Sequence, residues 1–89
     1  MSIHVTISLK IESFDRIKSV FDAAEDARVE AGITAKLYRN IDDTNNAWVI
    51  STVASKETFD AFFSSSAQQE RMKTAGVMAP PIITFLESS

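Results

Sequence analysis

The stretch from Asn46 to Ser55 constrains the fold most, because it concentrates β-branched and aromatic residues and holds the only tryptophan, Trp48. Such a run is typical of a β-strand. A helix start follows at once. Ser55 is a good N-cap residue, and the acidic Glu57 would lie near the positive end of the helix dipole. We therefore interpret this stretch as an inner strand of a small sheet, followed by a helix.

A second strand is predicted from Ile3 to Ile11, where apolar and polar residues alternate strictly. The odd positions are isoleucine, valine or leucine, and the even positions are His4, Thr6, Ser8 and Lys10. A period of two indicates a strand buried on one face. The polar face is made of small or neutral groups with a single lysine, so it would suit a ligand cavity as well as water.

Apolar residues recur at helical spacing from Phe14 to Ala31, which predicts one amphipathic helix with Ser13 as N-cap and Gly32 at its end. Residues 33–41 alternate again and predict a strand. The polar cluster at 42–46 is rich in turn-forming residues and favours a hairpin into the Trp48 strand.

The second helix is expected to bury Phe59, Phe62 and Phe63. The serines at 64–66 have low helix propensity and favour a kink or a restart there. Gly76 predicts the end of this helical region. A final strand at 82–86 follows two prolines, which are typical of an edge strand or of the first residues of a strand.

The order strand, helix, strand, strand, helix, strand predicts an α+β, ferredoxin-like fold in a single domain of residues 1–89. The first and third strands would lie in the middle of a four-stranded antiparallel sheet, with the helices on one face. The other face would carry apolar residues and favours a homodimer that joins two sheets face to face. Its residues would be either Trp48, Ile50 and Thr52 or Val49, Ser51 and Val53, together with Tyr38 and Phe85.

Composition excludes several classes of function. The absence of cysteine excludes disulfides, thiolate nucleophiles and cysteine-ligated metal centres. A net charge of −3 with scattered basic residues argues against nucleic acid as a partner, and the 48–53 strand lacks the basic residues of an RNA-recognition sheet. No apolar run is long enough to cross a membrane, and no signal peptide is visible, so we expect a cytoplasmic protein. Asp42 and Asp43 are interpreted as turn residues, and no metal or cofactor is expected.

His4 is the candidate catalytic residue, because it is the only side chain whose ordinary pKa lies near neutrality. It would act as a general base beside Thr6 and Ser8, or it is a solvated histidine at a strand end. Tyr38 and Trp48 would form a wall against a flat aromatic ligand, or they belong to the dimer core. Arg39, like Lys36, would bind an anionic group of the ligand or lie in solvent. The candidate ligand-binding residues are thus Thr6, Ser8, Tyr38, Arg39 and Trp48.

The whole chain resembles the dimeric α/β-barrel superfamily, and within it the antibiotic-biosynthesis-monooxygenase-like proteins. The resemblance rests on the strand 48–54, the helix start 55–59, and the tail from Ala75 through Pro80 and Pro81 into 82–86. It implies a homodimer whose two sheets close one barrel, with ligand pockets between sheet and helices. The haem-degrading branch is disfavoured, because the helix at 58–63 has phenylalanine where that branch has histidine, and the first strand has no asparagine.

The resemblance implies a small-molecule-binding protein that acts as a cofactor-free monooxygenase or a cyclase-like enzyme on a small aromatic substrate. The alternative is a non-catalytic ligand-binding or regulatory module, or a structural dimer. No catalytic motif in the sequence decides between an enzyme and a binding module.

Overall fold

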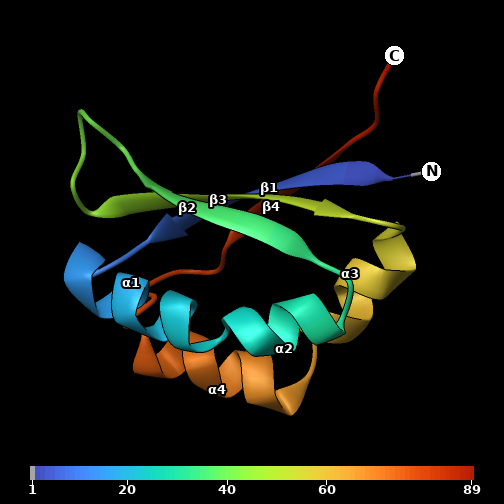
Figure 1. Cartoon of the computed structure of the whole chain (residues 1–89). Helices are drawn as coiled ribbons and strands as arrows, with labels where there is room; N and C mark the ends of the chain where they lie inside the picture. Colours follow the sequence, from blue (N-terminus) through green and yellow to red (C-terminus); the bar gives the residue numbers. More distant parts are fainter. Residues whose placement is uncertain (1) are drawn as a thin grey trace.

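The computed structural model describes residues 2–89 and shows one antiparallel sheet with all its helices on one face (Figure 1). The strand order is β2-β3-β1-β4, so the first and third strands lie in the middle, as predicted. The ferredoxin-like α+β fold is thereby confirmed. The elements in chain order are β1 (Ile3–Lys10), α1 (Phe14–Ala23), α2 (Glu25–Glu30), β2 (Thr34–Arg39), β3 (Asn46–Val53), α3 (Lys56–Phe63), α4 (Ser66–Thr74) and β4 (Ile82–Leu86).

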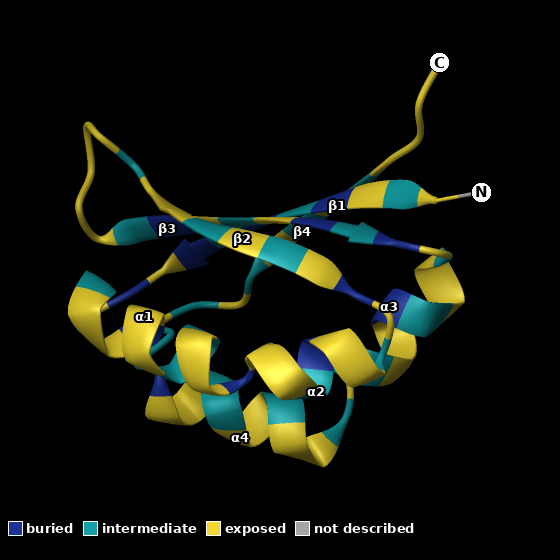
Figure 2. Ribbon diagram, in the orientation of Figure 1, coloured by how far each residue is buried: buried dark blue, intermediate teal, exposed yellow. Residues whose placement is uncertain are grey.

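The core lies between the sheet and the helices and is built from the odd-numbered residues of β1. Val5 and Ile11 are fully buried, and Phe59 of α3 packs against them in the same cluster. In Figure 2 the surfaces of the helices that face away from the sheet are largely exposed. The amphipathic pattern of the sequence therefore matches the observed layers.

Serine caps begin three of the helices. The hydroxyl oxygens of Ser13, Ser55 and Ser65 accept hydrogen bonds from the first turns of α1, α3 and α4. Gly32 and Gly76 both adopt φ +76°, the left-handed conformation that ends helices at low steric cost. The caps at Ser13 and Ser55 and both glycine ends were predicted correctly, as was the restart of the second helix at the serines; the cap at Ser65 was not predicted.

The predicted single helix over 14–31 is wrong, because the chain breaks at Ala24, with φ −94° and ψ 6°. At this break the Phe21 carbonyl accepts hydrogen bonds from the Ala24 amide and from the Arg28 side chain. The predicted strand also ends early, at Arg39, because the Asn40 side chain accepts a hydrogen bond from the Asp42 amide and starts the turn. Ile41 is consequently 94% exposed.

The register decides which residues the uncovered sheet face carries. Tyr38 lies opposite Trp48, Ile50 opposite Thr6, and Thr52 opposite His4, so the even-numbered set faces away from the helices. Phe85 was expected on this face, which is wrong. Its ring packs edge-on against Phe59, with 5.6 Å between the ring centroids, because odd positions of β4 point to the helices.

No helix within residues 2–89 combines the length and the apolar character that a membrane crossing requires. In the same range, no three side chains of His, Cys, Asp or Glu gather in a way that could hold a metal ion.

Candidate functional site

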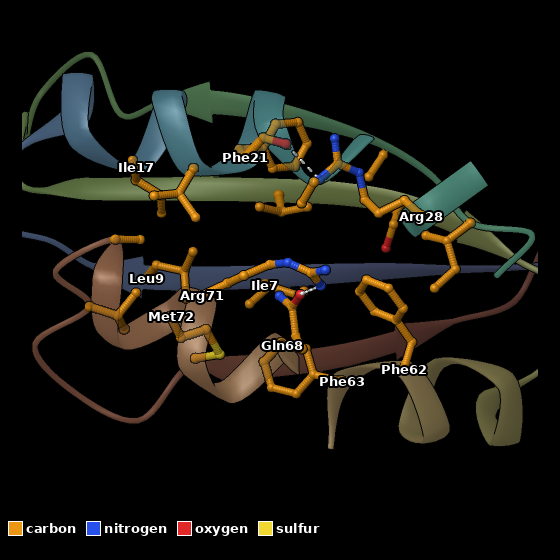
Figure 3. Close-up of a pocket in the computed structure, with 18 of the residues that line it drawn as sticks. Ile7, Leu9, Ile17, Phe21, Arg28, Phe62, Phe63, Gln68, Arg71 and Met72 are labelled. Carbon is orange, nitrogen blue, oxygen red and sulfur yellow. Dashed lines mark hydrogen bonds between the residues drawn. The ribbon is translucent and has the colours of Figure 1, made fainter. Parts of the chain in front are cut away.

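A cavity of about 80 Å³ lies between the inner face of the sheet and the helices (Figure 3). On this measure a single water molecule needs about 10–15 Å³, so the space exceeds one water several-fold. Every helix contributes to its walls. The walls are mainly apolar and aromatic, with Ile7 and Leu9 from β1, Phe21 from α1, Phe62 and Phe63 from α3, and Met72 from α4.

Both large and small residues line the cavity. Phenylalanine rings from α1 and α3 form part of its wall. Ala24 and Ala35 line the cavity with a methyl group only, so they leave space that the rigid helices do not close. Helix α4 has no buried residue and forms the outer wall.

Polar groups are few in this lining, and two are arginines. The guanidinium of Arg28 lies 3.7 Å from the centroid of the Phe21 ring, and its Nη1 donates a 2.9 Å hydrogen bond to the Phe21 carbonyl. Arg28 is only 9% exposed. On the opposite wall, Arg71 donates a 3.1 Å hydrogen bond to Oε1 of Gln68. The hydroxyl of Ser51, which also lines the cavity, donates to the Val5 carbonyl.

Burial lowers the pKa of Arg28 from its ordinary value, and the nearby positive charge of Arg71 lowers it further. The carboxylates of Glu25 and Asp22 act in the opposite direction on this pKa. An arginine side chain nevertheless keeps its charge in proteins. The cavity therefore presents positive charge inside a mainly apolar wall.

The cavity lining among residues 2–89 contains no histidine, carboxylate, lysine, tyrosine or cysteine. Its only ionisable side chains are the two arginines. The site is therefore equipped to hold and neutralise an anion, whereas none of its side chains can accept a proton near neutral pH.

Most of the predicted site residues lie on the other side of the sheet. His4, Thr6, Ser8, Tyr38 and Trp48 all point to the uncovered face, and none of them lines the cavity described above. Nδ1 of His4 lies 3.3 Å from the Thr52 hydroxyl oxygen, and Ser8 accepts a hydrogen bond from the Asn46 side chain. The structure brings Tyr38 and Trp48 together as directly opposed residues. The catalytic and ligand-binding roles of these residues stay predictions.

Arg39 lies on the helix side of β2, at the edge of the sheet. Its guanidinium is 5.2 Å from the centroid of the Phe14 ring, and it does not line the cavity. Its predicted role in anion binding stays a prediction.

Sequence reasoning missed Arg28 and Arg71. A signal was present for Arg28, which falls four residues after the buried Ala24 and so interrupts the apolar stripe of the helix predicted over 14–31. Arg71 gave no such signal, because α4 has no buried residue. A charge in a buried stripe is informative, because it must find a partner or serve a site.

The fold and the cavity together define a ferredoxin-like α+β domain with a small apolar site between sheet and helices. Solved structures share this fold along the whole chain. A candidate antibiotic biosynthesis monooxygenase from Bordetella bronchiseptica matches with a TM-score of 0.84 at 16% identity, covering 99% of this chain and 97% of that one. One from Caulobacter crescentus CB15 matches with a TM-score of 0.77 at 19% identity, covering 99% and 90%.

SnoaB, a cofactor-independent oxygenase from Streptomyces nogalater, matches with a TM-score of 0.78 at 11% identity, covering 99% of this chain and 93% of that one. No protein-family model and no curated protein sequence matches this chain. The resemblance inferred from the sequence is thus confirmed at the level of the fold.

Proposed function

We propose that this protein binds a small aromatic molecule in the cavity between the sheet and the helices and oxygenates it without a cofactor. The observation that carries the proposal is the apolar, phenylalanine-rich cavity of about 80 Å³ with only a few polar groups. Sites of this composition suit flat, apolar ligands, and the few polar groups fix the orientation of the ligand. The fold shared with a cofactor-independent oxygenase supports the same proposal.

The proposed chemistry needs little from the protein beyond binding and electrostatics. The substrate is a single-ring, ionisable phenol, and molecular oxygen is the oxidant. The ring carbon opposite the hydroxyl is oxidised to a carbonyl. One oxygen atom enters the product, and the other leaves as water together with the hydrogen of that carbon and the hydroxyl hydrogen. The apolar walls exclude water from the reactive carbanion, and a nearby positive charge stabilises it.

A non-catalytic ligand-binding module is the second candidate, and one observation favours it. Within residues 2–89 no side chain of the cavity can remove a proton at neutral pH. An enzyme at this site would have to receive its substrate already ionised, or bind it with a lowered pKa. A binding module has no such requirement.

Oxygen consumption tests the two candidates. Simple single-ring phenols are supplied to the full chain, and oxygen uptake and quinone absorbance are followed together. Oxygenation that disappears when the cavity is filled by Ala35→Leu supports an enzyme at this site. Binding without oxygen uptake supports the module instead. His4→Ala is measured in parallel, because a large loss in this variant would move the chemistry to the other face of the sheet.

We also propose a homodimer through the uncovered face of the sheet. Among residues 2–89, five of the eight large hydrophobic residues that are exposed lie on this one face, namely Tyr38, Trp48, Ile50, Ile82 and Leu86. An apolar patch of this kind on a two-layer domain is typical of an association surface, and a second sheet would complete a barrel. Trp48, which was predicted either to form part of a ligand wall or to belong to the dimer core, is 38% exposed in the single chain and would be covered by the partner.

A further inference from the structure

The proposed oxygenation uses a positive charge near the substrate but does not say which atom of the ligand the two arginines of the cavity bind. We infer that the cavity takes its ligand as an anion, an ionised phenol, enol or carboxylic acid on a small apolar body, with the charged oxygen between the guanidinium groups of Arg28 and Arg71. The inference rests on the proposed binding role of the cavity and names the chemical class of its ligand.

The two guanidinium groups approach the cavity from different helices. Figure 3 shows Arg28 extending from α2 and Arg71 from α4, toward the space between them. Both residues line the same small cavity, and the positive charge of Arg71 lowers the pKa of Arg28. Two planar donors converging on one volume are suited to oxygen anions, because each can donate parallel N–H bonds.

Most of the donor capacity of these arginines is free. Each guanidinium has five N–H donors, yet each donates to one acceptor in the protein. This acceptor is the Phe21 carbonyl for Arg28 and the Gln68 side chain for Arg71. No buried side-chain nitrogen or oxygen within residues 2–89 lacks a partner. The remaining N–H groups are therefore reachable from the cavity or from solvent.

The charge of this pair is not compensated inside the cavity. The ion pairs found within residues 2–89 are Glu12 with Arg16 and Lys18 with Asp22, and neither arginine of the cavity takes part in one. Of the carboxylates that influence Arg28, Asp22 is bound to Lys18 at 2.8 Å, and Glu25 is exposed. The sheet and α3 contribute only uncharged side chains to the lining.

A purely structural role accounts for Arg28 only in part. Its hydrogen bond to the Phe21 carbonyl ties α2 to the end of α1, which explains one N–H group. It does not explain why a second arginine faces the same apolar space from α4. Two like charges beside apolar walls are costly, and an anion between them would remove their repulsion. The chain has a net charge of −3, so carboxylates were available for pairing, and none lines the cavity.

A positive pair of this kind must favour the ionised form of a weak acid. An opposite charge within about 4–6 Å lowers the pKa of an acid by about 1–3 units. A bound phenol should therefore titrate at lower pH than the free phenol, and its neutral analogue should bind more weakly. This preference would also supply the ionised substrate that the proposed oxygenation needs, without a protein base.

The test uses para-nitrophenol, whose phenolate is yellow, and its methyl ether para-nitroanisole, which cannot ionise. Both are titrated into the full chain across neutral pH while absorbance reports the ionised fraction. We expect the bound phenol to have a pKa lower by about one unit or more. The phenolate should bind at least about tenfold more tightly than the ether, the ratio that corresponds to one pKa unit.

Substitutions of the two arginines test whether they cause the tighter binding of the phenolate. Arg71→Gln and Arg28→Gln should each remove most of the preference for the phenolate while leaving affinity for the ether within about twofold, because the apolar walls are unchanged. Arg28→Lys keeps the charge and should retain part of the preference, which covers the case in which Arg28→Gln does not fold. Lys73→Gln is the matched control, since it removes one positive charge from α4 outside the lining.

The outcomes separate the two proposals. If the ether binds as tightly as the phenolate, or if both arginine variants keep the preference, the anion site is wrong and the cavity still binds an apolar ligand. If neither compound binds, the cavity is not a ligand site and both proposals fail.

Discussion

Arg28 lies 3.7 Å above the centroid of the Phe21 ring and donates a hydrogen bond to the carbonyl of the same residue. A single side chain thus holds α2 against the end of α1 at the point where the predicted helix breaks. The same contact fixes a positive charge at the wall of the cavity. The stability of the fold and the proposed ligand binding would therefore both depend on this residue, and its variants must be compared by both measurements.

Replacing Arg28 by alanine should destabilise the domain by about 2 kcal/mol, because it removes a partly buried hydrogen bond and a desolvated cation–π contact. Urea unfolding, followed by circular dichroism, measures this change in the free energy of unfolding. Lys56→Ala is the control, since Lys56 is exposed and lies 4.8 Å from the Phe85 ring centroid. It should cost no more than about 1 kcal/mol, as exposed cation–π contacts do. Equal losses in the two variants would contradict the structural role given to Arg28.

Filling the cavity should separate binding from stability. Ala35 lies on the inner face of β2 and lines the empty space, so Ala35→Leu should enter it with little strain. We expect ligand affinity to fall at least tenfold, while the free energy of unfolding changes by less than about 1 kcal/mol. Overpacking of a filled core would instead cost about 1–3 kcal/mol. A loss of that size with unchanged binding would show that ligands do not occupy this space.

Trp48 should report the proposed dimer. Because it is 38% exposed in the single chain, a partner sheet would bury it and shift its fluorescence to the blue. Dilution of the protein until the dimer dissociates should reverse this shift. Trp48→Ala should weaken the dimer by about 2 kcal/mol or more, as large aromatic anchors do at interface centres.

Sedimentation velocity measures the loss of the dimer directly. Val29→Ala is the matched control, because Val29 is an exposed apolar residue on α2, on the helix side of the molecule. It should leave the dimer unchanged. A wild-type protein that sediments as a monomer at micromolar concentration would contradict the barrel arrangement.

The Asn46 side chain is the centre of a polar network at one end of the sheet. Its Oδ1 accepts hydrogen bonds from Nδ2 of Asn40 and from Nε1 of Trp48, and its Nδ2 donates to the Ser8 hydroxyl and the Leu9 carbonyl. Asn46→Ala should cost about 2 kcal/mol, because several partly buried partners lose their bonds. It should also change the environment of the Trp48 ring, which fluorescence detects.

Asn45→Ala is a useful comparison for this network. Asn45 also donates hydrogen bonds to the backbone just after β1, at the carbonyls of Ile11 and Glu12, but its side chain is not hydrogen-bonded to Trp48. Its loss should reduce stability without altering the fluorescence spectrum of the folded state. A spectrum that changes equally in both variants would show that the tryptophan responds to the loop as a whole.

Much of this fold could be predicted because the signals are local. The alternation in β1, the serine caps at Ser13 and Ser55, and the left-handed glycines at 32 and 76 each depend on a few neighbouring residues. Together with the right-handed rule for crossovers, they lead to one strand order. The break at Ala24 was missed because it depends on a side chain four residues further on, which folds back to the Phe21 carbonyl.

The tertiary structure decided what the periodicity left open. A period of two defines two faces of β3 but does not say which one the helices cover, so Trp48 and Val49 were equal candidates for the open face until the register was known. The cavity could not be predicted from the sequence for the same reason. Arg28 and Arg71 lie on different helices and line one cavity only because both helices border the same space. The size of that space is set by side-chain volumes from seven separate elements and the segments that join them. Local sequence determines what each element is, whereas only the packing of all of them determines which charges share one volume.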